Sequence, residues 1–543
     1  MARISKLEVW AWTCICATLI AVRLYPSFVP NLSNDAFQYL SVAQNALAGH
    51  FSYTSLIHFD AERSFGVMPA PMVTFPPGYP FAIALVSLVG VPLQSAALLV
   101  SAMSTLACVP LLAWIATQLG LSRLLRNVVV VGFVFNAAII ELGASAVSEA
   151  LFTFVVLLGV ALLVAARLHA DTSWGWRWAA AGLALGAAYW VRYAGLFFVL
   201  GLAVLVIRHL LASNRLQAKG YAGALTVAGA AVLAGMARNI LLVGTWRGGN
   251  VQKIVSDPLW PLLVDTAAAG KILVLGPSFG MPGWTSIPRA LFIAFFFAGM
   301  AWLTWRHLRH GAAQTQPRPA LKGIGVDLLI LMLTYSGCMF YAKLTSVIDY
   351  DPRYYVPLTP LLMLLLGLAL RTMLTTPAQW SISRRLALLA LGASFCCYVV
   401  VNFVLVVRPS SFDPSSVAKL MHSTSIDGKA AHAAVLELVG PTRVVVANNG
   451  QAVGHVLGRP TVSLVGPRYN AVEWNEKAIH DVVHQYNAAA IVIYVPIAAQ
   501  WDNGDFMPSP FVRQLAQGEA PSWMKLVYRS SEFLVYEPRL GAS

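Results

Sequence analysis

Charged residues are scarce in this sequence of 543 residues. Only 11% are Asp, Glu, Lys or Arg, whereas 58% are hydrophobic, and a soluble domain ordinarily has about 25% charged residues. Because a large soluble core still needs a charged surface, this deficit excludes a wholly soluble protein. Apolar runs of about 17 to 25 residues, the length needed to cross a bilayer, recur along the first 405 residues. They predict a polytopic membrane protein.

Cysteine is also scarce, with six residues, none of them in the last 136 positions. No CxxC pair or Cys/His ligand spacing occurs, so neither a disulfide framework nor a zinc site is supported. No G-x-G-x-x-G or G-x-x-x-x-G-K-S/T motif opens a helix in the C-terminal region, so a nucleotide site there is unsupported. We therefore predict no certain cofactor. A divalent cation stays an alternative because carboxylates are present, although no ligand spacing marks a metal site.

The formal net charge of +14 is distributed unevenly. From Arg408 onward 11 Lys and Arg are matched by 11 Asp and Glu, so the excess lies in short connectors between the apolar runs. That placement indicates membrane topology and argues against a nucleic-acid partner. Eleven spans are predicted, at about 9–26, 92–119, 127–145, 148–166, 178–190, 194–207, 221–243, 288–305, 324–342, 355–374 and 386–406.

Alternation of these spans from an inside N-terminus places six connectors in the cytoplasm. The connectors are 1–7, 120–126, 167–177, 208–220, 306–323 and 371–385, and they hold 16 Lys and Arg against the single acid Asp171. Such an asymmetry fixes the orientation. It predicts a multi-pass protein of a bacterial plasma (inner) membrane, with the C-terminal region on the periplasmic, extracytoplasmic face.

Two regions depart from a simple series of spans. Tyr79–Gly90 is apolar but too short to cross the membrane, so we predict a helix that lies at the outer membrane surface or enters the membrane partway. Residues 408–543 alternate strand-like runs, such as Thr442–Ala447 and Ala489–Val495, with polar helical stretches such as Glu473–Tyr486. This alternation predicts a small α/β domain. The expected organisation is an all-α membrane domain at 1–407, with a long first outer loop at 27–91, followed by a soluble domain at 408–543.

The predicted topology gathers polar residues on the outer face. Ionisable residues at membrane ends are costly unless paired, so they are functional candidates, with snorkelling or loop solvation as the plainer alternative. The candidates are Asp35, Asp60, Glu62, Tyr79, Glu149, Arg192, Arg238, Lys343, Arg353 and Tyr354.

Asp35 begins a stretch, 35–47, whose apolar residues share one helix face. This pattern predicts an amphipathic helix on the membrane surface. Asp35 at its N-terminus is explained either as a helix cap or as an ionised carboxylate available to act as a general base. Both interpretations stay open at this stage.

Several segments together resemble bacterial GT-C glycosyltransferases, the polyprenyl-phosphate-sugar-dependent membrane enzymes related to protein mannosyltransferases and lipid A aminoarabinose transferases. The segments are NDAFQYLSVAQNAL at 34–47, TFPPGYP at 74–80, SEALF at 148–152, VRYAGL at 191–196, RNILLVGT at 238–245 and DPRYYVPLTP at 351–360. The resemblance covers about residues 1–406. Each motif alone is weak, but their order along the chain is fairly specific.

The resemblance implies an inverting transfer of a sugar from a polyprenyl-phosphate donor to a lipid, glycan or protein acceptor. It also implies an acid in the first outer loop and basic residues at the phosphate. Asp35 matches the acid best, Glu149 is a second carboxylate, and Arg238 and Arg353 match the phosphate contacts. Several relatives begin this loop with a paired Asp-Glu, whereas Ala36 follows Asp35 here, so Asp60 or Glu62 is left as a substitute.

Three other functions are alternatives to glycosyl transfer. A transporter or flippase of lipid-linked sugars would have charges near mid-span and repeated halves, and the sequence shows no clear repeat. A glycan polymerase or ligase of different topology, and a scaffold that binds through its C-terminal domain, are the remaining alternatives.

Overall fold

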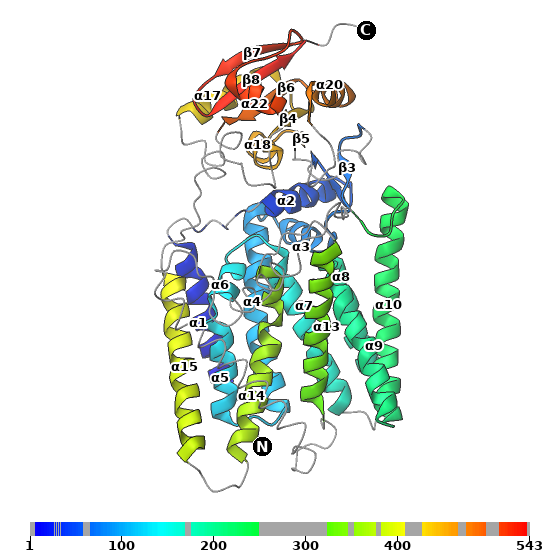
Figure 1. The fold of residues 1–543 in the computed structure, drawn as a ribbon, viewed down its shortest axis with the longest axis vertical. Coiled ribbons are helices and arrows are strands. Elements are labelled where there is room, and N and C mark those ends of the chain that lie inside the picture. The colour runs from blue at the N-terminus through cyan, green and yellow to red at the C-terminus, as the bar shows by residue number, and fades with distance from the viewer. Residues whose placement is uncertain are drawn as a thin grey trace. The chain divides into compact units, whose positions relative to one another are not determined.

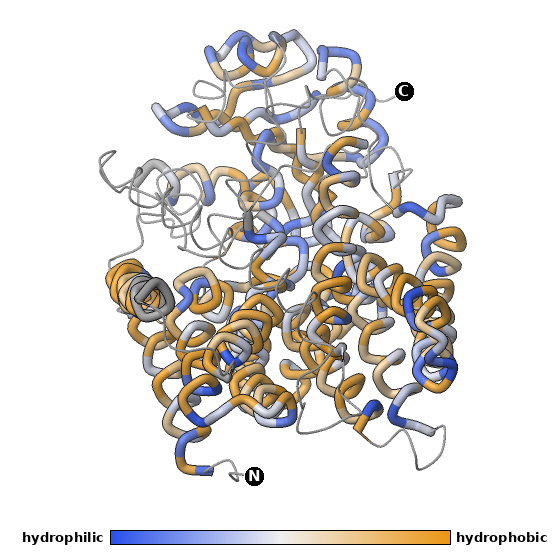
Figure 2. The backbone as a smooth tube through the Cα atoms, turned by 60° about the horizontal axis from the view of Figure 1, so that its bottom comes forward, coloured by the Kyte–Doolittle hydropathy of each residue, from blue (hydrophilic) through white to orange (hydrophobic). Residues whose placement is uncertain are grey.

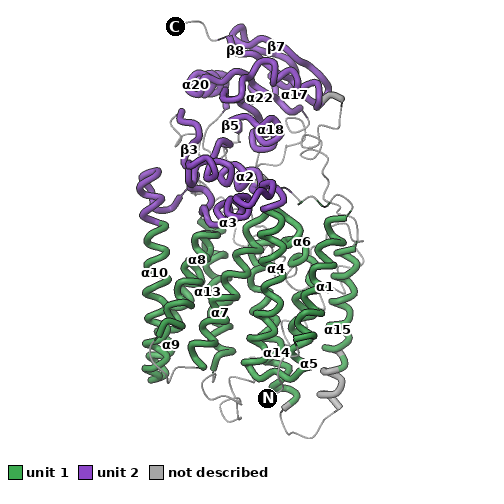
Figure 3. The backbone as a smooth tube through the Cα atoms, turned by 180° about the vertical axis from the view of Figure 1, so that it is seen from behind, with its two compact units in different colours: residues 1–31, 97–235, 255–411 green, residues 32–96, 236–254, 412–543 purple. Residues whose placement is uncertain are grey.

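The fold was examined in a computed structural model of the chain (Figure 1). It describes residues 6–25, 28, 30, 32, 34–57, 66–168, 175–248, 323–345, 352–375, 382–407, 426–464, 474–495 and 510–539. The predicted span at 288–305 and the candidate residues Asp60 and Glu62 lie outside these ranges. The described residues belong to two compact units, one formed by 1–31, 97–235 and 255–411 and the other by 32–96, 236–254 and 412–543 (Figure 3).

Long apolar helices make up most of the first unit. The helices of the membrane part are α1 (Lys6–Leu24), α4 (Leu93–Gln118), α5 (Arg123–Val134), α6 (Ala137–Gly143), α7 (Ser148–Leu168), α8 (Trp176–Val191), α9 (Gly195–Leu211), α10 (Arg215–Val243), α13 (Ile324–Thr345), the 3-10 helix η4 (Pro352–Leu358), α14 (Thr359–Thr375) and α15 (Ile382–Val407). Within the described residues, six are long and apolar enough to cross a membrane, or seven if the bent pair α5–α6 is one span.

Large apolar side chains on the surface of these helices support a lipid environment. Trp10 on α1 is 67% exposed, and Leu233 on α10 and Leu389 on α15 are similarly exposed. Figure 2 shows apolar residues along the full length of most of these helices. Apolar surface of this extent is unfavourable in water, whereas it is favourable against lipid. The multi-span membrane architecture predicted from the sequence is confirmed at this level.

The predicted span at 127–145 is bent. Helices α5 and α6 meet at Asn136 at an angle of 58°, and the Asn136 side chain accepts a hydrogen bond from the Ile139 backbone N–H. The Ala137 N–H donates to Asn402 Oδ1 at 2.9 Å, and Asn136 Nδ2 donates to Tyr398 Oη at 3.0 Å. Backbone groups freed at a break inside a membrane need such partners. Side chains of α15 provide them.

The second unit contains a six-stranded mixed sheet. Its elements are α2 (Asn34–Leu47), β1 (Tyr53–Thr54), β2 (Leu56–Ile57), β3 (Ala70–Pro71), α3 (Gly78–Ser87), α17 (Ile426–Leu438), β4 (Val445–Ala447), α18 (Gly450–Leu457), β5 (Thr461–Ser463), α20 (Glu476–Gln485), β6 (Ala490–Tyr494), α22 (Pro510–Gln517), β7 (Met524–Arg529) and β8 (Phe533–Pro538). The strand order is β2-β5-β4-β6-β8-β7, and β1 pairs separately with β3. Strands β2, β5, β4 and β6 are parallel, whereas β8 and β7 are antiparallel.

Helices cover both faces of this sheet. Ile479 and Val483 of α20 and Leu515 of α22 pack on one face, and Val435 of α17 and Val453 of α18 pack on the other. The predicted α/β character of the C-terminal region is therefore confirmed. The short apolar helix expected at Tyr79–Gly90 and the amphipathic helix expected at 35–47 are present as α3 and α2.

Candidate active site

A buried acid lies at the start of α7. Glu149 occupies the first turn of this helix, and its side chain is 1% exposed. The Thr153 hydroxyl donates to the Glu149 carbonyl at 2.7 Å, and Ser148 Oγ lies 3.5 Å from Glu149 Oε2. A buried ionised carboxylate requires opposite charge close by. Two arginines from other segments provide it.

Arg192 and Arg353 both approach the same oxygen of Glu149. Arg192 Nη1 is 2.8 Å from Oε1, and Arg353 Nε is 3.4 Å from it. Arg192 Nη1 also donates to Ser148 Oγ at 2.8 Å. The arginine side chains are 17% and 26% exposed, respectively, so the acid is enclosed while both cations reach the surface. Two positive charges therefore surround one negative charge.

An aromatic ring supports both guanidinium groups. The Cζ atoms of Arg192 and Arg353 lie 5.1 and 5.4 Å from the centroid of the Tyr354 ring, within the range of a cation–π contact. Tyr335 on α13 donates its hydroxyl to the Tyr354 carbonyl at 2.7 Å, which fixes the backbone of η4. We call Glu149, Arg192, Arg353 and Tyr354 the arginine cluster.

A tight turn brings Arg192 to this position. Helix α8 ends at Val191, and Arg192 has an extended backbone with φ −149° and ψ 136°. Helix α9 then starts at Gly195, where an added Cβ would lie 2.3 Å from the Tyr189 backbone nitrogen. Only glycine allows this close approach. The turn therefore directs Arg192 towards Ser148 and Glu149 from between two helices.

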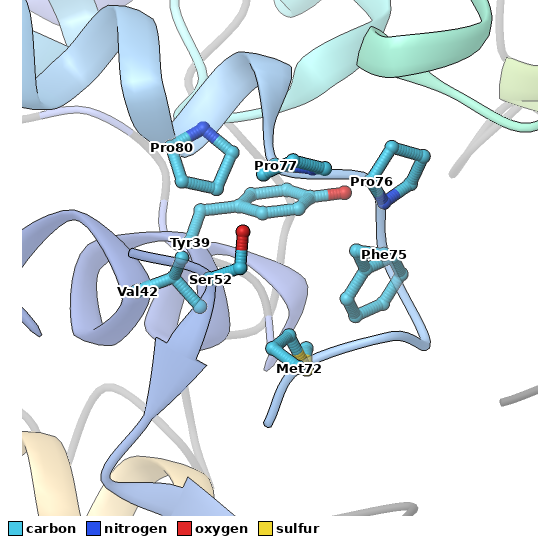
Figure 4. Close-up of a pocket in the computed structure, with 8 residues that line it drawn as sticks. All are labelled: Tyr39, Val42, Ser52, Met72, Phe75, Pro76, Pro77 and Pro80. Atoms are coloured by element: carbon cyan, nitrogen blue, oxygen red, sulfur yellow. The ribbon is translucent and has the colours of Figure 1, made fainter. Parts of the chain in front are cut away.

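Other candidates lie in the second unit. Asp35 is partly exposed in the first turn of α2. Tyr39 of the same helix stacks edge-on against Phe75 and Tyr79, at centroid distances of 5.2 and 5.1 Å. Figure 4 shows the Tyr39 ring lying along a small apolar pocket, which is lined by Tyr39, Val42, Ser52, Met72, Phe75, Pro76, Pro77 and Pro80. Tyr79 itself is fully buried, as expected for a side chain that packs against α2.

Arg238 and Lys343 are held within the protein. Arg238 donates to the Met72 carbonyl at 2.7 Å and to Asn239 Oδ1 at 2.8 Å, so it ties α10 to the loop before α3. Lys343 lies in the last turn of α13 and is 7% exposed. Among the predicted candidates, the structure thus brings Glu149, Arg192, Arg353 and Tyr354 together in one unit and places Asp35, Tyr79 and Arg238 in the other.

A second ionic cluster was not anticipated as a site. Asp327 on α13 is paired with Arg167 of α7 and Arg208 of α9, and Tyr221 of α10 donates its hydroxyl to Asp327 Oδ2 at 2.9 Å. We call these four residues the aspartate cluster. An acid inside a predicted span was the available signal, but both arginines were explained as topology determinants.

The arginine cluster suits an anion better than a metal ion. Its one carboxylate already faces two cations, and hard cations need several oxygen ligands. Over the ranges that the structure describes, no three His, Cys, Asp or Glu side chains are grouped as metal ligands. Arginine forks match phosphate oxygens. The cluster therefore offers donors of the kind that phosphate groups accept hydrogen bonds from.

Part of the chain matches a known protein family. Residues 74–237 match the family model described as dolichyl-phosphate-mannose-protein mannosyltransferase. This segment contains Glu149 and Arg192. A comparison with curated protein sequences finds no significant match.

The fold is shared with solved structures at low sequence identity. The chain resembles ArnT from Cupriavidus metallidurans bound to undecaprenyl phosphate, with 14% identity, a TM-score of 0.58 and 99% of both chains covered. It also resembles the oligosaccharyltransferase AglB from Archaeoglobus fulgidus in complex with an inhibitory peptide and a dolichol-phosphate, with 12% identity, a TM-score of 0.56, and 97% of this chain and 80% of that chain covered.

A third likeness extends over a much larger protein. The arabinofuranosyltransferase AftD from Mycobacteria has 16% identity and a TM-score of 0.50, and the match covers 99% of this chain but 42% of that one. The multi-span helical architecture, the match to a mannosyltransferase family model and the shared fold together show that the chain is a membrane glycosyltransferase of the GT-C type.

Proposed function

We propose that this glycosyltransferase moves a sugar from a polyprenyl-phosphate-linked donor to an acceptor at the outer face of a bacterial plasma membrane. The arginine cluster carries the proposal, because Arg192 and Arg353 meet at one buried carboxylate and on one aromatic ring. Two of the similar solved structures are bound to undecaprenyl phosphate and to a dolichol-phosphate, and these lipids support the donor class.

In the proposed reaction, Arg192 and Arg353 bind the donor phosphate and Glu149 orients them. Asp35 takes the proton from the acceptor group. The acceptor atom then attacks the anomeric carbon, and the bond between that carbon and the phosphate oxygen breaks, so that the configuration is inverted. The electron pair leaves with the polyprenyl phosphate, where the arginines stabilise the added negative charge. Lipid, glycan and protein acceptors all fit this scheme.

The remaining candidates receive positioning or electrostatic roles. Arg238 holds the segment before α3 by its hydrogen bond to the Met72 carbonyl. The ring of Tyr79 packs against the ring of Tyr39 on α2. Lys343 adds positive charge at the end of α13. We further propose that 1–407 is the catalytic membrane domain and that 408–543 is a periplasmic domain that is not needed for phosphate binding.

Replacement of the proposed base tests the mechanism. Asn has nearly the volume of Asp and still caps a helix, so Asp35→Asn separates capping from proton transfer. A general base contributes about 10² to 10⁴ in rate. In a strain that lacks the protein, wild-type chain should restore the missing glycan in mass spectra of the cell envelope, and Asp35→Asn should not, although it inserts and binds undecaprenyl phosphate.

The matched control is Asp481→Asn, because Asp481 is an exposed acid on α20 and its loss should leave the glycan intact. If Asp35→Asn restores the glycan fully while Asp60→Asn or Glu149→Gln does not, the base is not Asp35. If all three restore it, the proposed reaction is wrong.

A further inference from the structure

The segment after α2 supplies a strand to the sheet of the C-terminal region. Strand β2 pairs in parallel with β5, with Leu56 opposite Thr461 and Ile57 opposite Val462. The Thr461 N–H donates to the Ser55 carbonyl at 2.9 Å, and both strand residues of β2 are buried. A short strand of the first loop therefore completes the edge of a sheet that is otherwise built about 400 residues later in the chain.

Helix α18 closes tightly over this strand. A Cβ added at Gly454 would lie 2.4 Å from Leu56 Cδ2 and 2.5 Å from Thr461 Oγ1. Real side chains do not approach so closely, so any larger residue here must push the strand or the helix away. The close contact between α18 and β2 consequently requires a residue without a side chain at position 454.

The two residues that precede this strand are bonded to α2. The Ser55 N–H donates to Ser41 Oγ at 2.9 Å, Thr54 Oγ1 donates to Ser41 Oγ at 3.1 Å, and Asn45 Nδ2 donates to Ser55 Oγ at 3.1 Å. These bonds lie on the face of α2 that is turned to the strand. A displacement of β2 is therefore transmitted to α2.

His455 makes a second connection to α2. Its ring lies 4.9 Å from the ring of Phe37, which is completely buried, and its Nε2 is 2.9 Å from Gln94 Nε2. Phe37 lies two residues after Asp35 on the same helix. One residue of the C-terminal region thus contacts both the helix that carries Asp35 and the first turn of α4.

We propose that the C-terminal region is a positioning domain for α2, with His455 as a positioning residue that holds Asp35 in the geometry needed for sugar transfer. The proposal rests on the function proposed above. It assigns no chemistry to His455, since this residue acts through Phe37 and the backbone of α2. It explains why a domain without a recognisable ligand motif is packed against the loop that carries the candidate base.

Hydrogen exchange on the full-length protein tests the structural part without any substrate. In His455→Ala and Gly454→Val, backbone amides of α2 should exchange at least about tenfold faster than in wild type, because opening of a segment becomes easier when its packing contacts are removed. His484→Ala is the matched control, since His484 is exposed on α20 on the other face of the sheet, and it should leave α2 unchanged. Unchanged exchange of α2 in both test variants would overturn the inference.

Transfer measurements test the functional part. With the glycan identified in the complementation experiment as the readout, His455→Ala should slow product formation about tenfold and leave the affinity for undecaprenyl phosphate unchanged. His455→Gln, which can still bond Gln94, should recover part of the rate. Faster exchange of α2 with a wild-type transfer rate would overturn the positioning role. Failure of the proposed function would instead appear as no transfer by the wild-type chain, while the exchange result stood unaffected.

Discussion

Glu149 and Asp327 are both buried carboxylates that face two arginines, and they belong to clusters at opposite ends of α7. In the aspartate cluster, Asp327 accepts hydrogen bonds from both arginines and from Tyr221. Arg167 is as buried as the acid, at 2% exposed, whereas Arg208 is 28% exposed. In the arginine cluster, both arginines reach the surface and rest on Tyr354. A fully buried arginine paired with a carboxylate that also accepts from a tyrosine indicates a structural joint, whereas two partly exposed arginines on one aromatic ring indicate a binding site.

Topology gives the sharpest test of this comparison, because the result is all-or-none. The positive connectors predict that the arginine cluster lies at the outer end of α7 and that the C-terminal region lies outside. An alkaline phosphatase fused after Ser543 should be active, and a cytoplasmic reporter at the same place should be inactive. The opposite pair of results would exchange the two ends of α7 and remove the proposed outer active site.

Stability should respond most strongly at the aspartate cluster. Asp327→Asn leaves the buried Arg167 without its counter-charge, and breaking a buried pair costs about 3 to 5 kcal/mol. We expect a clear fall in the thermal midpoint in detergent with little change in transfer per folded molecule. Arg123→Ala, at an exposed pair with Glu8, is the control and should have almost no effect on the midpoint. A stable but inactive Asp327→Asn would refute a purely structural role.

Activity should respond most strongly at the arginine cluster. Glu149→Gln keeps the shape of the side chain but removes the charge that holds Arg192 and Arg353 together. Because a displacement of about 1 Å in a binding group can cost about 10²-fold in rate, we expect transfer to fall by about that factor. The complementation assay and the thermal midpoint should be measured together. A wild-type transfer rate in Glu149→Gln would show that this carboxylate does not orient the arginines.

Local pattern in the sequence predicted much of this structure, whereas contacts between distant segments were beyond it. The apolar face of 35–47 gave α2, and the apolar runs at Thr442–Ala447 and Ala489–Val495 gave β4 and β6. The break at Asn136 was missed because apolar residues on both sides continue the hydropathy of a single span. Strand β2 has only two residues, so no periodicity marked it.

The candidate site was also predictable only in part, because the sequence marked single residues but not the contacts between distant ones. Glu149, Arg192, Arg353 and Tyr354 were singled out as polar residues at predicted membrane ends, but nothing in their spacing showed that one acid anchors both arginines. Ser148, which accepts a hydrogen bond from Arg192, and Tyr335, which donates one to the Tyr354 carbonyl, were not singled out. Asp349 and Asp351, two acids that come shortly before Arg353 in the sequence, lie outside the described residues.

The smallest expected effect concerns pH and the contact of α18 with α2. Burial lowers the pKa of His455 below its ordinary value of 6.5, so the folded state binds fewer protons than the unfolded state. The contribution of a neutral His455 to stability is complete above pH 6.5 and is lost as the pH falls below that value. Protection factors of α2 amides should therefore decrease between about pH 7.5 and about pH 5.5 in wild type, and less so in His455→Gln.

Neighbouring titratable groups are the same in both proteins of that comparison. Burial also lowers the pKa of His432, but this contribution cancels in the difference between wild type and variant. An equal pH response in the two proteins would show that protonation of His455 does not weaken the contact.

Binding of undecaprenyl phosphate to Arg353 and Arg208 variants tests the central claim most directly. Loss of a charged hydrogen bond costs about 1.5 to 3 kcal/mol, so Arg353→Ala should bind this lipid about tenfold or more weakly than wild type. Arg353→Lys should recover the affinity only in part, because it keeps the charge but not the planar fork. Arg208→Ala, at the aspartate cluster, should bind as wild type does. Wild-type affinity in folded Arg353→Ala, or an equal loss in Arg208→Ala, would contradict the account.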